Sequence, residues 1–333
     1  MELALYAPGL GYYARDDRQL GARPASGSDF VTAPELSPLF GRALARQIGQ
    51  TLDAAAADEV LEFGAGSGAL AAQLLDALGT RVSRYTIVDL SASLVARQRA
   101  TLQHFGARVR WLDALPDAIS GAVIGNEVLD AMPVQLLAFD GAFWHERGVA
   151  AAGGAFAWSD RATDSTPPVA ADFVPGTVVE VGRQARAFVA TVAERLHRGA
   201  VFLVDYGFPQ REYYHPQRTG GTLMCHRAHR ADADPLVDVG LKDITAHIDF
   251  TAIALAAQET GCDVVGYTTQ AHFLVNCGLL DDLRDAAARV VAPAHKLIAE
   301  HEMGELFKVI GFARGLPSFD PIGFVHGDRA HRL

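Results

Sequence analysis

The segment Leu61 to Gly68, LEFGAGSG, places three glycines at alternate positions between an apolar run and a helix-like segment. Glycine adopts positive φ angles at little cost and carries no Cβ atom, so Gly64, Gly66 and Gly68 predict a tight strand-to-helix turn that a ligand can approach closely. We also count Ala65, which lies between the first two glycines, as a ligand-binding residue. The first chemistry that the sequence predicts is therefore binding of a small molecule with an adenosine end.

Two classes of cofactor compete for this turn. Gly64, Gly66 and Ala69 fit the relaxed G-x-G-x-x-G/A pattern of dehydrogenases, which keeps an NAD-dependent oxidoreductase open. Glu62 and Gly68 add the order E-x-G-x-G-x-G, which is typical of S-adenosylmethionine-dependent methyltransferases. A carboxylate beside the turn repels a pyrophosphate but attracts a ligand that carries an ammonium and a sulfonium group. The sequence contains neither a G-K-[ST] motif nor a convincing dehydrogenase constellation, so the methyltransferase interpretation is favoured.

Acidic residues follow the next two predicted strands. Asp89, with Leu90 beside it, ends the second strand, where a carboxylate can accept hydrogen bonds from both ribose hydroxyls. Asp113 and Ala114 follow the third strand, where methyltransferases of this fold often contact the adenine amino group. A single acid at such a place is often only a solvated loop residue. Their placement at successive strand ends favours cofactor binding.

Apolar runs alternate with helical patterns around these residues. The expected strands are 59–63, 85–88, 108–111 and 122–125, and the expected helices are 68–78 and 93–105. This alternation predicts an α/β fold with a doubly wound, Rossmann-like parallel sheet. Ser67 is a candidate N-cap for the first helix.

The second half of the chain has a different texture. Residues 134–159 contain the turn signals Asp140-Gly141 and Gly153-Gly154 and predict an antiparallel β insertion. The α/β pattern then resumes with a helix at 183–197 and a strand at 200–205. An irregular block at 208–248, rich in Tyr, His, Arg and Gly, is the candidate for substrate contacts. A helix at 251–260, a strand at 263–267, helices around 281–300 and a closing strand at 307–312 complete the prediction.

We expect the following division of the chain: an N-terminal lid segment (1–50), the first part of the cofactor-binding core (51–133), the β insertion and linker (134–175), the rest of the core (176–207), mostly helical and irregular substrate-side segments with a core strand near 263–267 (208–300), and a closing strand with a tail (301–333).

Composition restricts the partners and the compartment. The net charge of −10 argues against a nucleic-acid or membrane surface, because both need clustered lysine and arginine, and it suits a cationic substrate. Cys225, Cys262 and Cys277 form neither a disulfide framework nor a paired metal motif. With no secretory signal and no membrane-length apolar run, we expect a cytoplasmic protein. Edge strands of the β insertion could pair two copies into a homodimer.

Beyond the glycine turn, ordered motifs extend over nearly the whole chain: ALYAPGLGYY (4–13), SDFVTAPELSPLFG (28–41), LEFGAGSG (61–68), NEVLDAMPV (126–134), DYG (205–207), DITAHIDF (243–250) and MGELFKV (303–309). Together they resemble one family, the MidA-type class I methyltransferases, which include a mitochondrial complex I assembly factor that methylates an arginine of a complex I subunit. The resemblance implies a Rossmann-like class I methyltransferase sheet. The departures are small: Ser28 stands where the family usually has glycine, and Asp89 stands where it commonly has glutamate.

The resemblance implies an S-adenosylmethionine-dependent methyltransferase of a protein arginine. A guanidinium is a poor nucleophile, and it needs carboxylates that fix its planar fork and accept a proton. Glu127 and Asp130, with Asn126 beside them, follow the fourth strand and supply such groups. Alternatively, Asn126 and Asp130 only cap a turn before Met132-Pro133. A non-catalytic alternative is an assembly factor that binds S-adenosylmethionine for structural reasons.

Several further residues are candidates on weaker grounds. Family resemblance suggests that Phe30 and Thr32 belong to a lid over the cofactor, although residues 32–35 also read as a plain helix start. Tyr13 is a candidate for the acceptor channel. Asp243 and His247 are candidates for its wall, whereas Asp249 also reads as a helix N-cap. The Cys225 to His229 cluster lacks the partner spacing of a zinc site, so we expect no metal.

Overall fold

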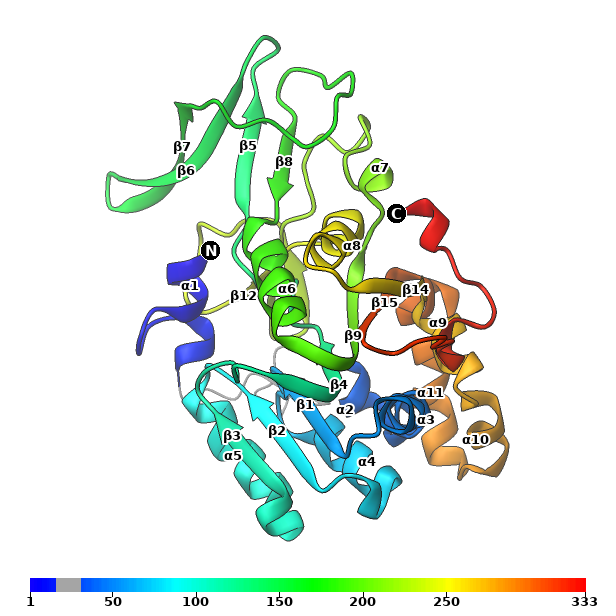
Figure 1. The fold of residues 1–333 in the computed structure, drawn as a ribbon. Coiled ribbons are helices and arrows are strands. Elements are labelled where there is room, and N and C mark those ends of the chain that lie inside the picture. Colours follow the sequence, from blue (N-terminus) through cyan, green and yellow to red (C-terminus); the bar gives the residue numbers. More distant parts are fainter. Residues whose placement is uncertain (16–30) are drawn as a thin grey trace.

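The computed structural model describes residues 1–15 and 31–333 (Figure 1). Its centre is an 8-stranded sheet in which seven strands follow the order β14-β15-β9-β4-β1-β2-β3 and β13 pairs with β9. Neighbouring strands from β3 to β9 run parallel, whereas β15 is antiparallel to both β9 and β14. The predicted doubly wound sheet is confirmed, with a mixed edge that the sequence did not indicate. The strands are β1 (Glu59–Phe63), β2 (Arg84–Val88), β3 (Val109–Leu112), β4 (Ile119–Asn126), β9 (Leu196–Phe208), β13 (Ile248–Asp249), β14 (Asp263–Thr269) and β15 (Phe307–Arg314).

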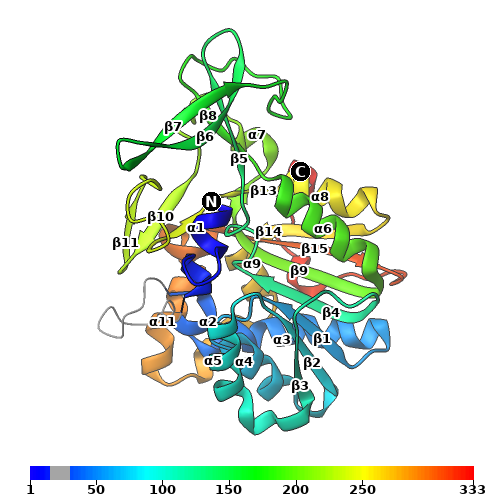
Figure 2. The same ribbon diagram turned by 90° about the vertical axis from the view of Figure 1, so that its left-hand side faces the viewer.

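Helices cover both faces of this sheet and bury a separate apolar core on each (Figures 1 and 2). One core forms against α3 (Pro38–Ala55), α4 (Ala69–Leu78), α5 (Ala92–Leu102), α9 (Gln270–Asn276), α10 (Leu279–Asp285) and α11 (Ala288–Ile298). The other forms against α6 (Arg183–Arg195) and α8 (Phe250–Glu259). The shorter elements are α1 (Glu2–Tyr6), η1 (Tyr12–Ala14), α2 (Ala33–Leu36), η3 (Gly79–Arg81), η4 (Gln103–Arg108), α7 (Gln210–Tyr213), η5 (Glu300–Gly304), η6 (Ile322–Phe324) and η7 (Ala330–Arg332).

Side-chain caps decide where several helices begin. The Ser37 hydroxyl accepts a hydrogen bond from the Leu39 N–H (3.3 Å) ahead of α3. Asp249 caps α8 through the N–H groups of Thr251 and Ala252, so its predicted capping role is confirmed. The prediction for Ser67 is wrong, because α4 has Gly68 as its N-cap residue and no side-chain cap. The left-handed φ of 84° at that position favours glycine, and it leaves the serine hydroxyl free to bond elsewhere.

The predicted β insertion is an antiparallel sheet that projects from one end of the molecule (Figures 1 and 2). Asp140 closes the first hairpin by accepting hydrogen bonds from the N–H groups of Ala142 and Phe143, both at 2.7 Å. Gly153 and Gly154 form the second turn at φ values of 59° and 82°. The sheet has the order β7-β6-β5-β8, with β5 (Gln135–Phe139), β6 (Trp144–Ala152), β7 (Ala155–Ala162) and β8 (Val178–Val181).

The block at 208–248, expected to be irregular, also contains a small sheet. Its order is β11-β10-β12, with β10 (Met224–Arg227), β11 (Arg230–Asp232) and β12 (Asp243–Thr245). Helix α1 packs against this sheet through Ala4 and Leu5, which form a satellite core with Cys225 and Ile244. The strands have only three or four residues each, too few for an alternating pattern to be recognised. None of the helices in the described ranges is long and apolar enough to cross a membrane.

Candidate active site

A cavity of about 1210 Å³ lies where β1, β2, β3 and β4 end. Open α/β sheets bind ligands at the carboxyl ends of their parallel strands, and this volume exceeds that of most single-ligand pockets. Phe30 lies outside the described residues, and Gly68 faces Gln98 and Leu102 instead of the cavity. The other predicted site residues all line it: Tyr13, Thr32, Glu62, Gly64, Ala65, Gly66, Asp89, Leu90, Asp113, Ala114, Asn126, Glu127, Asp130, Asp243 and His247.

The glycine turn has the predicted backbone conformation. The φ angles of Gly64, Gly66 and Gly68 are 59°, 54° and 84°, a region that side-chain-bearing residues rarely adopt. The Gly64 N–H donates to the carbonyl oxygen of Val88 (3.0 Å), which ties the turn to the end of β2. A Cβ atom on Gly64 would lie 3.2 Å from the Val128 side chain. The cavity wall here is therefore bare backbone.

Glu62 lies under the turn with 2% of its surface exposed. The Tyr85 hydroxyl donates a hydrogen bond of 2.7 Å to its carboxylate. Burial raises the pKa of Glu62 to about 8, and the tyrosine bond offsets only part of that effect. A cationic group beside Glu62 would favour its ionised form, so this carboxyl is suited to a positively charged ligand.

Asp89 is held by a buried glutamine that the sequence analysis did not identify. The Gln98 side-chain NH₂ donates to the Asp89 carboxylate (2.7 Å) and to the carbonyl oxygen of Gly66 (3.1 Å). Its own oxygen accepts from the Trp111 indole N–H (3.0 Å). Gln98 thus joins the glycine turn and the ends of β2 and β3 into one network. Burial raises the pKa of Asp89 above its ordinary value.

The segment before α3 is fixed against the glycine turn by helix α4. The Gln73 side chain donates to the Pro34 carbonyl oxygen (2.8 Å) and accepts from the Gly41 N–H (3.0 Å). The Ser67 hydroxyl donates to the Glu35 carboxylate instead of capping α4. Thr32 and α2 consequently stand at the edge of the cavity.

The loop after β4 carries the predicted carboxylate pair. Glu127 has a left-handed φ of 54°, and its carboxylate accepts a hydrogen bond from the Asn126 amide (2.9 Å). Burial, followed by the nearby Asp130 charge, raises the pKa of Glu127 to about 8. Burial also raises the pKa of Asp130 to about 6, although a hydrogen bond donated by the Tyr206 hydroxyl partly offsets this effect. The Asn126 side-chain oxygen is buried without a partner in the described structure.

Asp205 on β9 holds the loop after β4 in place. Its carboxylate accepts from the N–H groups of Leu129 (2.9 Å) and Asp130 (3.2 Å) and is fully buried. Burial, reinforced by the Asp130 and Glu127 charges, raises the pKa of Asp205 well above its ordinary range. Asp130 also accepts the Ala131 N–H, so the turn-capping interpretation holds for Asp130 beside its contact with the cavity.

Aromatic side chains form the wall next to the carboxylates. The Tyr13 hydroxyl donates to Asp243 (3.0 Å), and the Tyr6 hydroxyl donates to the carbonyl oxygen of Ala131 (2.9 Å). The rings of Tyr6 and Tyr13 stack with centroids 5.7 Å apart. The His247 ring lies edge-on to Tyr206 at 5.1 Å, and burial lowers its pKa to about 4, so it is neutral at pH 7.

Glu180 connects the β insertion to this wall. It is 1% exposed and accepts from the N–H groups of Thr222 (2.8 Å) and Leu223 (3.0 Å). The Thr222 hydroxyl in turn accepts the His247 N–H (3.0 Å). Gly221 has a φ of 71°, and a Cβ atom there would lie 2.2 Å from the Glu180 side chain. Only glycine fits at this close approach.

The described residues hold no group of three or more His, Cys, Asp or Glu side chains placed to bind a metal ion. Cys225, which began the histidine-rich cluster, is fully buried in the satellite core under α1.

Comparison with known proteins identifies the family. Residues 43–268 match the model of a family described as "Putative S-adenosyl-L-methionine-dependent methyltransferase", which is more than half of the chain. The chain belongs to this family. A crystal structure of a family relative from Burkholderia thailandensis bound to S-adenosyl-homocysteine is 50% identical and superposes with a TM-score of 0.96. That comparison covers 100% of this chain and 90% of the other.

Curated relatives are more distant. The protein named "Protein arginine methyltransferase NDUFAF7, mitochondrial" from Danio rerio is 27% identical over 92% of this chain and 81% of its own length. Its homologue from Caenorhabditis elegans is 24% identical over 85% of this chain and 73% of its own length. The protein is therefore an S-adenosylmethionine-dependent methyltransferase, with S-adenosylmethionine as its cofactor.

The residues present fit this cofactor. The glycine turn offers bare backbone, Asp89 offers a fixed carboxylate, and the Asn126 oxygen is a buried acceptor without a partner. S-adenosylmethionine carries hydroxyl, amino and ammonium donors that acceptors of this kind can satisfy. No positively charged side chain other than Arg218 lines the described cavity, in agreement with a ligand that has no phosphate.

Proposed function

We propose that this methyltransferase transfers the methyl group to an arginine side chain of a protein. The observation that carries the proposal is the excess of carboxylic side chains over basic ones in the cavity lining. Eight described carboxylic side chains line it, against the single guanidinium of Arg218; the eight are Glu2, Glu35, Glu62, Asp89, Asp113, Glu127, Asp130 and Asp243. A lining with this imbalance favours cationic guests.

On the cofactor side, we assign the turn from Gly64 to Gly68 and Glu62 to the amino-acid end of S-adenosylmethionine. Asp89, with Leu90 beside it, would accept the ribose hydroxyls, as the position at the end of β2 favours. Asp113 and Ala114 would contact the adenine after β3. Asn126 would use its unpartnered oxygen toward the same ligand. When bound, S-adenosylmethionine supplies an electrophilic methyl group.

On the acceptor side, Glu127 and Asp130 would receive the guanidinium. Two carboxylates on one loop can accept several N–H donors of its planar fork and localise its charge. One of them must also take the proton that the attacking nitrogen loses when its bond to carbon forms. The pKa of about 8 for Glu127 is close to neutral pH, which suits a general base. Tyr6, Tyr13 and the neutral His247 would line the channel for the alkyl part of the side chain.

The names of the curated relatives support an arginine acceptor. Several curated relatives at 24–27% identity carry protein arginine methyltransferase in their names. The names place those proteins in the mitochondrion, and the MidA-type family that the sequence motifs resemble includes a mitochondrial complex I assembly factor. A respiratory complex I subunit is therefore the first acceptor to test for this chain.

The test compares Glu127→Gln with Glu259→Gln, an exposed glutamate on α8 that pairs with Arg186 at the surface. S-adenosylhomocysteine binding should persist in both variants. Methyl transfer to protein from a deletion strain should fall at least ~100-fold in Glu127→Gln only, the usual range for losing a general base. Mass spectrometry should locate the product methyl groups on arginine, in the parent strain and not in the deletion strain. A fully active Glu127→Gln enzyme removes Glu127 from the reaction, and methylation at another residue type refutes the arginine acceptor.

The non-catalytic alternative makes a different prediction. If cofactor binding alone matters, the Glu127→Gln variant should restore assembly of respiratory complex I in a deletion strain as well as the wild-type gene does. If methyl transfer matters, only the wild type and the Glu259→Gln control should restore it.

A further inference from the structure

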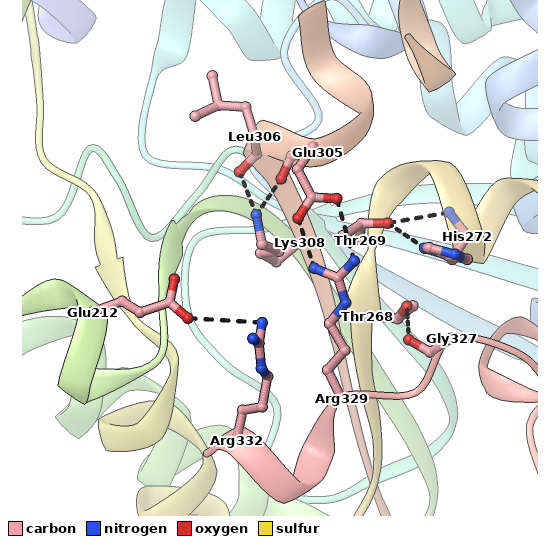
Figure 3. Close-up of polar contacts among 10 residues, drawn as sticks. All are labelled: Glu212, Thr268, Thr269, His272, Glu305, Leu306, Lys308, Gly327, Arg329 and Arg332. Carbon is pink, nitrogen blue, oxygen red and sulfur yellow. Dashed lines mark hydrogen bonds and ion pairs between the residues drawn. The ribbon is translucent and has the colours of Figure 1, made fainter. Parts of the chain in front are cut away.

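A second cavity has a volume of about 370 Å³, and Figure 3 shows polar contacts of several residues that line it. Leu306 lines both cavities and separates them. The lining is dominated by charged side chains from β15, α7, η5 and the segment around η7. The described residues that line it are Phe208, Pro209, Glu212, Tyr267, Glu300, His301, Glu302, Glu305, Leu306, Lys308, Arg329 and Arg332.

Lys308 forms the floor of this second cavity. It is 6% exposed, and its ammonium donates to the backbone carbonyl oxygens of Glu305 and Leu306, the latter at 3.2 Å (Figure 3). Within residues 1–15 and 31–333, no carboxylate lies within ion-pair distance of it. A lysine has three N–H donors and a full charge, so this ammonium is incompletely satisfied. Burial lowers the pKa of Lys308, as expected for such a position.

Tyr267 on β14 adds a second polar group in need of a partner. Its side chain is 1% exposed and lines the cavity, and its hydroxyl is buried without a hydrogen-bond partner in the described structure. The Phe250 ring packs against it at 5.2 Å and fixes its orientation. The Lys308 ammonium and the Tyr267 hydroxyl can therefore both donate hydrogen bonds into this cavity.

The chain around η7 completes the site with two arginines. The Thr268 hydroxyl donates to the Gly327 carbonyl oxygen, and the Arg329 N–H donates to the Tyr267 carbonyl oxygen, both at 2.6 Å. Arg329 is engaged by Glu305 at 2.6 Å, whereas Arg332 meets Glu212 at 3.7 Å with both side chains half-exposed (Figure 3). Arg332 can therefore turn toward a ligand at small cost, because an exposed ion pair of this length contributes little.

The glutamates that line the second cavity do not form ion pairs with Lys308 at its floor. Glu212 and Glu305 pair with the arginines, and Glu302 lies 3.7 Å from Lys296 on α11. Glu300 and Glu302 are exposed at the rim. The buried part of the second cavity thus contains an ammonium group and a phenol, whereas the acidic side chains lie at its opening in contact with solvent.

We propose that this second cavity binds a small anion. Its carboxylate or phosphate oxygens accept hydrogen bonds from Lys308 and Tyr267, and its charge forms an ion pair with Arg332. Such a group satisfies both buried donors at once. The volume limits the ligand to a small molecule or to one side chain of a larger one. Since Leu306 lines both cavities, the anion would lie next to the methyl-acceptor wall without using the cofactor site.

The test uses calorimetry on the full chain saturated with S-adenosylhomocysteine, so that the cofactor site is occupied. Inorganic phosphate and acetate are titrated separately, and the tighter of the two identifies the anionic group. Saturable one-to-one binding should weaken at least tenfold in Lys308→Met and in Tyr267→Phe, which retains the aromatic ring. Arg284→Met removes an exposed charge on α10 and should leave binding unchanged.

Three results would overturn the site: no saturable binding of either anion, unchanged binding in both Lys308→Met and Tyr267→Phe with circular dichroism like that of the wild type, or anion binding that is found only in the protein without S-adenosylhomocysteine. Glu127→Gln should bind the anion as the wild type does. Failure of the arginine-acceptor proposal therefore leaves this inference standing.

Discussion

Replacing Gln98 with methionine tests whether cofactor affinity depends on the network behind the glycine turn. The methionine side chain has a similar length and volume, so the core position of Gln98 stays filled. The substitution removes the hydrogen bonds to the Asp89 carboxylate (2.7 Å), the Gly66 carbonyl (3.1 Å) and the Trp111 indole (3.0 Å). Three groups that Gln98 now satisfies then lose a partner.

The expected magnitude follows from those bonds. Each neutral hydrogen bond contributes about 0.5–1.5 kcal/mol, and one to a charged group contributes about 1.5–3 kcal/mol. We therefore expect the free energy of unfolding to fall by roughly 3 kcal/mol. The loss is not larger because Asp89 and Trp111 are only partly buried, so that water replaces some of the lost hydrogen bonds. The Asp89 carboxylate also becomes less well oriented and harder to ionise, because the Gln98 bond lowers its pKa. A cost of about 1.4 kcal/mol in binding corresponds to a tenfold weaker affinity for S-adenosylhomocysteine.

Calorimetry with S-adenosylhomocysteine and a denaturant titration measure the two effects separately. Gln103→Met is the matched control, because Gln103 follows the same helix and is exposed. It should leave both affinity and stability unchanged. If Gln98→Met loses stability but binds S-adenosylhomocysteine within twofold of the wild type, Gln98 is a structural residue and the positioning argument for Asp89 is wrong.

Three other perturbations have expected outcomes. The unliganded protein should lose stability as pH rises from about 4.5 to about 8. Folded Glu127 keeps its proton until about pH 8, whereas the unfolded chain releases that proton near the ordinary pKa of a glutamate. Denaturant titrations at several pH values should show a smaller loss of unfolding free energy in Glu127→Gln than in the wild type. Glu180→Met should loosen the segment at Thr222 and Leu223, since both N–H groups lose the oxygen atom to which they donate, and hydrogen exchange at those amides should rise while S-adenosylhomocysteine affinity holds. Ser37→Ala should cost about 1 kcal/mol of unfolding free energy through loss of the α3 cap, measured by denaturant titration, and no change would show that the 3.3 Å bond contributes nothing.

The cofactor half of the fold could be predicted because its signals are local. The glycine turn, the acids at strand ends and the hairpin turns each need a residue type that few alternatives replace. The structure places Glu62, Asp89, Asp113 and Asn126 along one cavity, as their positions at successive strand ends predicted. The same reasoning failed at Ser67, where the positive φ of the following glycine overrode a common capping preference.

The residues that the sequence did not reveal act across long separations. Gln98 is one polar residue within a helix, and its hydrogen bonds join three strand ends that only the folded sheet brings together. Asp205 and Tyr206 belong to the DYG motif (205–207), yet their contacts with the loop after β4 depend on the pairing of β9 with β4. Glu180 reaches Thr222 across more than forty residues of chain. No local pattern encodes such contacts.

The protonation state of the carboxylates gives the arginine-acceptor proposal a direct thermodynamic signature. Glu127 has a pKa of about 8 and Asp130 of about 6, so at pH 7 the unliganded site holds at least part of one proton on Glu127. A guanidinium is always charged, and its approach stabilises the ionised carboxylate, so acceptor binding at pH 7 must release that proton. Calorimetry of an arginine peptide in two buffers with different ionisation enthalpies measures the release, which should approach one proton at pH 7 and disappear in Glu127→Gln. A neutral acceptor would bind without proton release in either protein, and that result would count against arginine even before any product is identified.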